Sequence, residues 1–466
     1  MLFCSYVFIL VFLPLLLFLY YIIKNRRYKN IILLIFSLIF YAWGEPKYIL
    51  LLLISIVINY FIAIMLERIN KNKKVLVIGV LVNILSIVIF KYLDFGILTI
   101  NGLFDTNIKK FNLTIPIGIS FYTFQSISYI IDVYRKKVKA EHNILNLGLY
   151  ISLFPQLVAG PIVKYKDIYN DIIDRKETID KFYNGIRRFM IGFAKKSIIA
   201  NNMAVVCDTI YSQNVGNISM PTLWLAAISF TLQIYYDFSG YSDMAIGLGK
   251  MFGFNIPENF NYPYISTSIS DFWKRWHISL TSWFREYVYI PLGGNKCSKI
   301  KWIRNIIIVF FLTGLWHGAS YNFIIWGLYN ALFIILEKTI LKKFLSKLNN
   351  ILKYLLTMLI IIIGFVIFRI ENLSDLLNII KGMFDISNIA FFDLYFSNYN
   401  LVMSSLYLPI GIIFVFPIFK LIKKKIKSKY DNIYNIISFL FIFIAYLYSL
   451  VLLINDSYNY FIYFKF

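Results

Sequence analysis

Long apolar runs separated by short basic stretches make up most of the chain. Apolar runs of roughly 17–25 residues can cross a bilayer as helices. We predict five membrane helices in the first part of the chain and three in the last part. They are Leu2 to Ile23, Ile31 to Trp43, Ile49 to Leu66, Val75 to Phe90, Ile115 to Ile131, Ile351 to Phe368, Leu406 to Ile422 and Ile436 to Ile454.

The basic stretches between these runs give the predicted orientation. Short cytoplasmic loops of membrane proteins carry an excess of Lys and Arg. Such stretches occur at 24–29, 68–74, 135–139, 342–353 and 423–429. Placing them all in the cytoplasm puts both the N-terminus and the C-terminus outside, and the fourth run then leads out to a loop reaching Asn112.

The middle of the chain, about 143–338, follows this pattern less well. Charges, Pro and Gly break its apolar stretches at intervals too short for clean spans. Such backbone is tolerated at membrane depth only inside protein or along a wet cavity. We therefore expect one integral-membrane domain over 1–466, with N-terminal spans at 1–135, an active-site core at 143–338 and C-terminal spans at 351–466.

Composition supports a membrane protein and excludes other classes. Hydrophobic residues make up 59% of the 466 positions and charged residues only 15%, too apolar for a soluble or disordered chain. The formal net charge of +23 comes from basic residues between apolar runs, so we expect no nucleic-acid binding. The three cysteines are far apart in sequence, so no metal site is expected.

His317 is the first candidate for chemistry. It is the one Asp, Glu, Lys, Arg or His in the apolar run Ile306 to Leu336. An ionisable group inside such a run usually faces a functional cavity, and an imidazole suits general base catalysis near neutral pH. The alternative is an imidazole held by a neighbouring helix. Gly314 and Gly318 could either allow close packing or break the helix, and the run could cross the membrane once or twice.

His277 is the second candidate. It lies within Ser268 to Tyr287, where Trp273, Trp276, Leu280, Trp283, Phe284 and Tyr287 form one stripe at helical spacing. This pattern predicts one amphipathic helix at the cytoplasmic interface, which could be a peripheral anchor without chemistry. Two of only three histidines in adjacent apolar contexts favour proton transfer instead. His142, in a basic loop, is expected to be solvated.

Asp237 and Asp243 interrupt an apolar run that begins near Leu223, together with Ser239. Buried acids need partners, so Asp237 could pair with an Arg or with a His ring proton, or be purely structural. Asp243 could favour the first turn of a following helix. From the residues alone, an enzyme and a proton-coupled transporter both remain possible; nucleotide-binding and hydrolase motifs are absent.

Together these segments resemble a known family, the membrane-bound O-acyltransferases, and within it the bacterial alginate O-acetyltransferase type. The resemblance covers nearly the whole chain in family order. It rests on Trp43–Lys47, Pro116–Gln125, Asp132–Arg135, Phe154–Pro161, Tyr236–Asp243, Phe272–Leu280, Tyr289–Gly294, Leu315–Gly318 and the aromatic tail Phe461–Phe466.

The resemblance implies an all-α fold, a ring of about 10–12 transmembrane helices around a thinned centre with a catalytic tunnel. It makes His317 the catalytic histidine and His277 a second active-site residue that orients the donor or stabilises developing charge. We expect substrate-binding or supporting roles at Asp237, Ser239, Trp273, Arg275, Trp276 and Trp316.

The resemblance also implies reactants and partners. The donor would be acetyl-CoA or an acylated carrier protein on the cytoplasmic side, with no bound cofactor and no metal. The acyl group would pass to a separate extracytoplasmic acetyltransferase that modifies a cell-surface polysaccharide, with the protein in a bacterial cell membrane. The alternatives are a D-alanyl transfer protein of teichoic acid modification, a transporter and a non-catalytic membrane scaffold.

Overall fold

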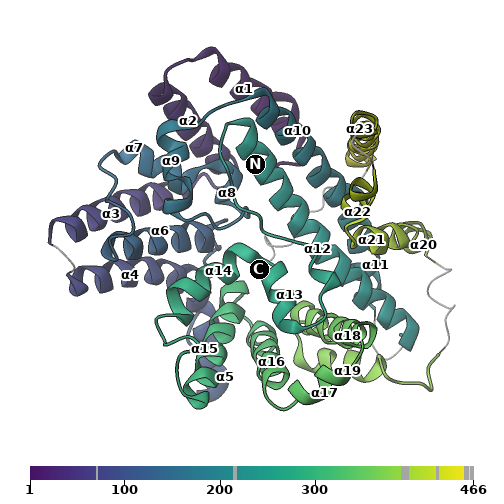
Figure 1. The fold of residues 1–466 in the computed structure, drawn as a ribbon. Coiled ribbons are helices and arrows are strands. Elements are labelled where there is room, and N and C mark those ends of the chain that lie inside the picture. The colour runs from purple at the N-terminus through teal and green to yellow at the C-terminus, as the bar shows by residue number, and fades with distance from the viewer. Residues whose placement is uncertain (70–71, 214–217, 390–397, 427–429, 456–460, 462–466) are drawn as a thin grey trace. The chain divides into compact units, whose positions relative to one another are not determined.

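The computed structural model describes residues 1–69, 72–213, 218–389, 398–426, 430–455 and 461, and within them the regular elements are all helices (Figure 1). The chain forms two compact units. The first contains residues 1–189 and 241–257, and the second residues 190–240 and 258–466. The expectation of a single domain stays a prediction. The expected aromatic tail lies outside the described residues apart from Phe461.

The first unit contains the helices of the N-terminal part of the chain. They are η1 (Val7–Phe12), α1 (Leu13–Ile22), α2 (Arg26–Gly44), α3 (Ile49–Arg68), α4 (Lys73–Ile87), η2 (Val88–Tyr92), α5 (Leu93–Phe104), α6 (Ile119–Tyr134), α7 (Ile144–Ser152), α8 (Phe154–Leu157) and α9 (Tyr165–Asp174). Two further helices, α10 (Ile179–Ala194) and α12 (Met220–Met251), run from one unit into the other.

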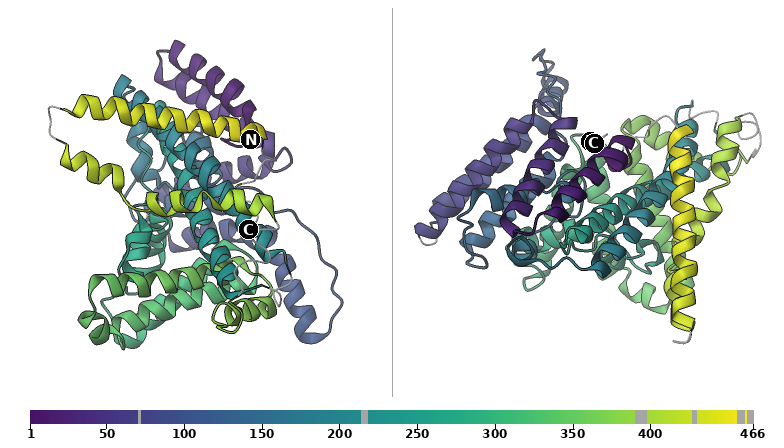
Figure 2. Two further views of the ribbon diagram at one scale, coloured as in Figure 1. Left: turned by 90° about the vertical axis from the view of Figure 1, so that its right-hand side faces the viewer. Right: turned by 90° about the horizontal axis from the view of Figure 1, so that it is seen from above.

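The second unit contains the remaining helices. They are η3 (Lys195–Ala200), α11 (Asn201–Tyr211), η5 (Pro263–Ile265), α13 (Ile269–Arg275), α14 (Ile278–Phe284), η6 (Arg285–Tyr289), α15 (Lys299–His317), α16 (Tyr321–Lys338), α17 (Lys342–Lys347), α18 (Asn350–Arg369), α19 (Leu373–Gly382), α20 (Tyr399–Ser405), α21 (Leu408–Phe414), α22 (Ile418–Lys425) and α23 (Asp431–Asn455). The last of these, α23, is one unbroken helix (Figure 2).

Five helices in the described residues are long and apolar enough to cross a membrane: Ile49–Arg68, Lys73–Phe104, Lys299–His317, Asn350–Arg369 and Asp431–Ile454. The pair Tyr399–Phe414 and Ile418–Lys425, bent by 47°, would make a sixth. These helices confirm an all-α polytopic membrane protein. The larger number of spans and the sidedness of the loops stay predictions.

The fourth predicted span is longer than the sequence pattern indicated. Helix continues through α4, η2 and α5 to Phe104, so the loop does not begin after Phe90. The apolar run ends at Lys91, but this side chain is only 7% exposed and lies inside the protein. Because a shielded lysine does not require solvent, the helix can continue past it.

The Asp237 region also differs from the prediction. We expected an interrupted run with Asp243 near the start of a following helix, but α12 is one helix of 32 residues that passes through both acids (Figure 1). The glycines of this segment do not end the helix, because they lie where a neighbouring helix packs closely against α12. At Gly240 an added Cβ would lie 2.7 Å from the backbone oxygen of Gly192 on α10.

The run around His317 folds as two helices joined by a short turn. α15 and α16 meet at glycines: an added Cβ at Gly314 would lie 2.3 Å from the Phe323 backbone oxygen, and one at Gly327 would lie 2.3 Å from that of Phe310. Such contacts are possible only without a side chain. Gly314 therefore serves close packing, one of the two alternatives open from the sequence.

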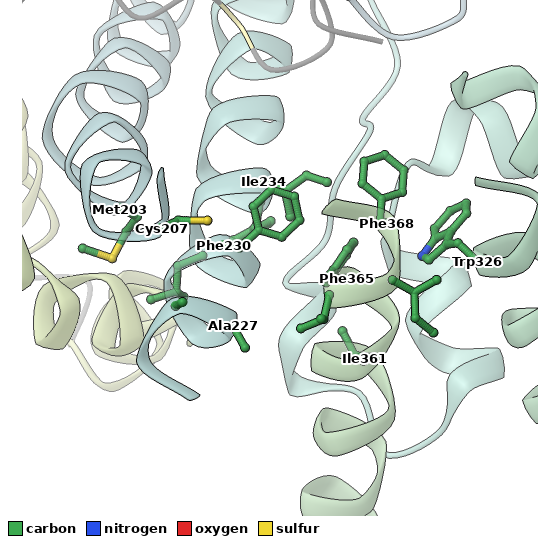
Figure 3. Close-up of a cluster of buried hydrophobic side chains, with 14 of the residues drawn as sticks. Met203, Cys207, Ala227, Phe230, Ile234, Trp326, Ile361, Phe365 and Phe368 are labelled. Carbon is green, nitrogen blue, oxygen red and sulfur yellow. The ribbon is translucent and has the colours of Figure 1, made fainter. Parts of the chain in front are cut away.

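A buried cluster in the second unit supports this hairpin (Figure 3). Phe365 and Phe368 of α18 and Trp326 of α16 lie in it, together with Phe230 of α12. The ring centroids of Trp326 and Phe368 are 5.1 Å apart with the planes at 73°. Edge-on aromatic packing fixes ring positions as well as burying apolar area. The position of the α15–α16 hairpin against α18 is therefore well defined.

In the first unit, Glu177 lies in the loop after α9 and joins two helices, α1 and α2. Its carboxylate accepts hydrogen bonds from Tyr20 of α1 and Arg26 of α2, and Lys29 Nζ lies 3.3 Å away. Burial would raise the pKa of Glu177, but the hydrogen bonds from Arg26 and Tyr20 outweigh burial and lower the pKa to about 2. The ionised carboxylate therefore stabilises this unit.

We expect Glu177→Gln to lower the midpoint of thermal unfolding at pH 7. A carboxyl whose folded pKa is lowered contributes stability above its ordinary pKa of 4.5 and loses it as the pH falls towards 2. The difference from wild type should thus narrow below about pH 4.5. Scanning fluorimetry of purified protein across this range measures it, and the exposed Glu371→Gln variant is the control. A pH-independent difference would contradict the charge argument.

We expect Gly314→Ala to destabilise the protein by about 1–3 kcal/mol, because the new methyl group meets the Phe323 carbonyl. Gly102→Ala on α5 is the matched control, since an added Cβ there meets nothing within 4 Å. Alanine favours helix, so the control should be neutral or slightly stabilised. Equal unfolding midpoints for the two variants would refute the packing role of Gly314.

Candidate active site

His317 is the last residue of α15, and the residue after it explains why the helix ends there. Gly318 is extended, with φ of −172°, and an added Cβ would lie 2.2 Å from the Phe323 ring. The turn thus brings the ring of Phe323 against the chain where α15 stops. His317 lies at a helix C-terminus, where the helix dipole favours a positive charge.

Aromatic rings surround His317 on several sides. Trp326 meets the imidazole edge-on with centroids 4.9 Å apart, Phe368 does so at 5.0 Å and Trp316 at 4.9 Å. The residue is 4% exposed. The rings hold the imidazole in one orientation and shield it from solvent. Proton transfer to or from His317 would therefore take place in a low-dielectric site.

His277 lies in a turn, and this corrects one prediction. The segment expected to form a single interfacial helix is broken into α13 and α14, and His277 between them has φ of 43° and ψ of 55°. This left-handed conformation costs a non-glycine residue about 1–2 kcal/mol. The stripe of aromatic residues lies mainly in the protein interior, because the break redirects it: Trp273 is 6% and Trp276 2% exposed.

The ring of His277 is fully enclosed. Its Nδ1 lies 3.1 Å from Asn259 Oδ1, and its ring meets Phe238 edge-on with centroids 4.6 Å apart. Burial lowers the pKa of His277 to about 3, so the imidazole is neutral at physiological pH. The ring centroid of His277 is also 5.5 Å from that of Trp316.

Trp316 therefore contacts both histidines. The structure brings together three predicted site residues, His277, Trp316 and His317, through one indole ring. Trp273 is next to this group, since its ring centroid is 5.7 Å from that of Trp326. Trp276 instead packs among Tyr264, Phe272 and Phe365 of the buried cluster.

Asp237 and Ser239 lie on α12 and face η3. Asp237 pairs with Lys196, and Lys195 Nζ lies 3.5 Å from Ser239 Oγ. The partner found here is a lysine, which was not among the Arg or His partners considered for Asp237. It is the residue between them, Phe238, that touches His277. Asp237 and Ser239 thus support the helix that carries Phe238.

The other polar residues singled out in the sequence form ion pairs with neighbouring side chains. Arg275 is partly exposed and forms an ion pair with Asp271 at 2.9 Å, one helical turn away. Asp243 lies within α12 and pairs with Arg188 at 2.6 Å. His142, predicted to be solvated, has a side chain that is 68% exposed and lies 2.8 Å from Glu67.

Sequence reasoning missed several residues of the site. Asn259 and Lys196 are polar residues in otherwise apolar or irregular stretches, and Trp326 and Phe368 lie on helices read only as spans. Lys196 had a usable signal, because a lysine pair inside a helical run calls for an acidic partner. Asn259 had none, since its partner His277 becomes a neighbour only through the left-handed turn.

Comparison with known proteins supports the resemblance seen in the sequence. A sequence profile described as MBOAT, membrane-bound O-acyltransferase family, matches residues 135–374, which include His277 and His317. The chain belongs to this family. A membrane-bound O-acyltransferase is an enzyme of multi-pass membrane location, in agreement with the apolar helices.

Relatives of this acyltransferase carry related names. The "Probable alginate O-acetylase AlgI" of Pseudomonas aeruginosa is 44% identical over 82% of this chain and 75% of the relative. The "Peptidoglycan O-acetyltransferase" of Helicobacter pylori is 35% identical over 84% and 81%. The "Teichoic acid D-alanyltransferase" of Bacillus subtilis is 34% identical, over 47% and 58%.

We expect Asp237→Asn to destabilise this acyltransferase by about 3–5 kcal/mol, because the change leaves the Lys196 charge buried without its counter-ion. The side chains of Asp237 and Lys196 are 1% and 10% exposed. The double variant Lys196→Met with Asp237→Met should recover much of the loss. Unfolding midpoints in detergent measure both. A single variant as stable as wild type would show that the pair contributes nothing.

Proposed function

We propose that this acyltransferase takes an acetyl group from a cytoplasmic thioester donor and passes it across the membrane for O-acetylation of a cell-surface polysaccharide. The observation that carries the proposal is the pair of buried imidazoles, His277 and His317, in contact with one indole ring. The names of the relatives at 44% and 35% identity, which refer to O-acetylation of alginate and peptidoglycan, give the acyl group and the acceptor class.

His317 is the general base in this proposal. It takes the proton of an accepting hydroxyl while the oxygen attacks the thioester carbonyl. The carbon–sulfur bond breaks, the acyl group moves to the oxygen, and the thiolate leaves and takes up a proton. The position of His317 at the C-terminus of α15 stabilises the imidazolium that forms in this step.

The donor would be acetyl-CoA or an acylated carrier protein, used as a substrate and not held as a cofactor. Lys274 and Arg285 beside the site are exposed, and Arg275 is partly so. Exposed cations of this kind attract the phosphates of CoA or an acidic carrier protein. No metal takes part in the proposed chemistry.

A separate extracytoplasmic acetyltransferase is the proposed partner that receives the acyl group and modifies the polymer. This arrangement follows from the family resemblance of the sequence and belongs to a protein in a bacterial cell membrane. A hydroxyl on such a partner, or on the polymer itself, would be the group that His317 deprotonates.

The second candidate is D-alanyl transfer to teichoic acid, as in the name of the Bacillus subtilis relative. That relative matches about half of this chain, whereas the alginate and peptidoglycan O-acetylation relatives match more than four fifths of it. The longer match favours acetyl transfer. A transporter, the other class left open by the residues, would show solute flux without any acyl donor.

We expect His317→Gln to lower acetyl transfer by about 10²–10⁴-fold, the usual contribution of a general base. The assay follows radiolabel from acetyl-CoA into surface polymer in membranes that carry the protein, with a parallel assay for D-alanine. His142→Gln is the matched control, because its side chain is 68% exposed and pairs with Glu67, and it should transfer at the wild-type rate. Label incorporated only from D-alanine would move the protein to the second candidate, and full activity of His317→Gln would sink the assignment of the base.

A further inference from the structure

Asn259 lies in the loop after α12 and makes three hydrogen bonds with the turn that carries His277. Its backbone oxygen accepts from the Ile278 N–H at 2.9 Å, and its Oδ1 accepts from the Ser279 N–H at 3.2 Å and from Ser279 Oγ at 2.8 Å. Asn259 and His277 are both 0% exposed. The loop and the turn are thus joined by buried hydrogen bonds inside the protein.

These contacts determine which end of the Asn259 amide faces His277. A backbone N–H can only donate, so the side-chain atom beside the Ser279 N–H must be the oxygen, and the amide cannot be flipped. That same oxygen lies 3.1 Å from His277 Nδ1. Because an amide oxygen only accepts, Nδ1 must carry the proton.

Ser279 does not offer another explanation. Its hydroxyl is 2.8 Å from Asn259 Oδ1 and 3.5 Å from His277 Nδ1, so it donates to the oxygen. The Nδ1–H of His277 then points to acceptors alone. In a neutral imidazole with a proton on Nδ1, the lone pair is on Nε2.

We propose that Asn259 is a positioning residue that holds His277 in the Nδ1–H form, so that Nε2 is a hydrogen-bond acceptor in the acyl-transfer site. The inference rests on the proposed function for what Nε2 accepts, an N–H or O–H hydrogen of the acyl donor, because the one proton of the accepting hydroxyl goes to His317. It decides between the two roles expected for His277: with an unprotonated Nε2 the ring can orient the acyl donor by accepting a hydrogen bond from it, but Nε2 cannot donate to a negatively charged oxygen.

Two further observations support this assignment. Within the described residues, His277 Nε2 is a buried nitrogen without a hydrogen-bond partner, although buried polar groups are normally paired. The left-handed backbone of His277 also costs energy, and strain of this kind is kept where it places a functional group. Burial, which lowers the pKa of His277, keeps the ring neutral and Nε2 unprotonated.

The direct test is nitrogen NMR of the full-length protein in nanodiscs with ¹⁵N-labelled histidine. The chain has three histidines, and His142→Gln and His277→Asn identify their signals. Asparagine tolerates the left-handed conformation, so His277→Asn is compatible with the turn. At neutral pH we expect His277 to show a protonated Nδ1 and an unprotonated Nε2. A protonated Nε2 in the wild type would overturn the proposal without need of any variant.

Variants of Asn259 extend the test. Asn259→Leu removes the acceptor and should abolish the preference for the Nδ1–H form, whereas Asn259→Asp keeps an acceptor oxygen and should retain the Nδ1 proton. Ser279→Ala is the matched control. It removes the hydroxyl that donates to Asn259 Oδ1 but leaves the contact between Asn259 Oδ1 and His277 Nδ1. An unchanged His277 spectrum in folded Asn259→Leu would overturn the proposal.

Kinetics of acetyl transfer give a separate readout. Asn259→Leu should lower kcat about 10²-fold or more with little change in KM. The reason is that the unprotonated Nε2 of His277 orients the acyl donor in the complex that has already bound both substrates. Ser279→Ala should stay close to wild type, and Asn259→Asp should recover part of the loss. If the wild type transfers no acetyl group, the proposed function fails while the spectrum still decides the tautomer. If it transfers and Asn259→Leu is fully active, the positioning role fails alone.

Discussion

The contact between the backbones of α15 and α16 is the constraint on which the site depends. Gly314 and Gly327 let the two helices approach to a separation that no side chain would allow. This brings Trp326 beside His317 and lets Phe368 of α18 pack against the same ring. Without that approach the imidazole would have neither its orientation nor its dry surroundings. The chemistry therefore depends on two residues that have no side chain.

The sequence was a good guide to the fold class and to the long apolar helices, because membrane helices obey a simple length and charge rule. α3, α18 and α23 lie close to the predicted runs. The rule failed at Lys91. This charged residue ended the fourth predicted span in the sequence, but in the structure it is buried and the helix continues past it. The rule also failed along α12, where buried partners satisfy polar residues that looked like breaks.

For the site, the sequence indicated both histidines and Trp316 but not the geometry that joins them. Helical periodicity predicts a continuous stripe, and a single left-handed residue cannot be read from a periodic pattern. The break at His277 is what turns the aromatic stripe inwards and brings Asn259 to the ring. The partner of Asp237 was missed for a similar reason, since η3 places two consecutive lysines against α12.

The backbone at His277 also limits which amino acids the position can hold. Among non-glycine residues, Asn, Asp and His are the ones that adopt left-handed geometry most readily. Of these, only histidine has a donor and an acceptor on opposite sides of a rigid ring. A turn of this shape therefore restricts the position to a few residue types. Among them, only histidine can be held through one ring nitrogen while the other stays available for a substrate. The backbone conformation of this turn thus restricts which side chain can act here, independently of any substrate.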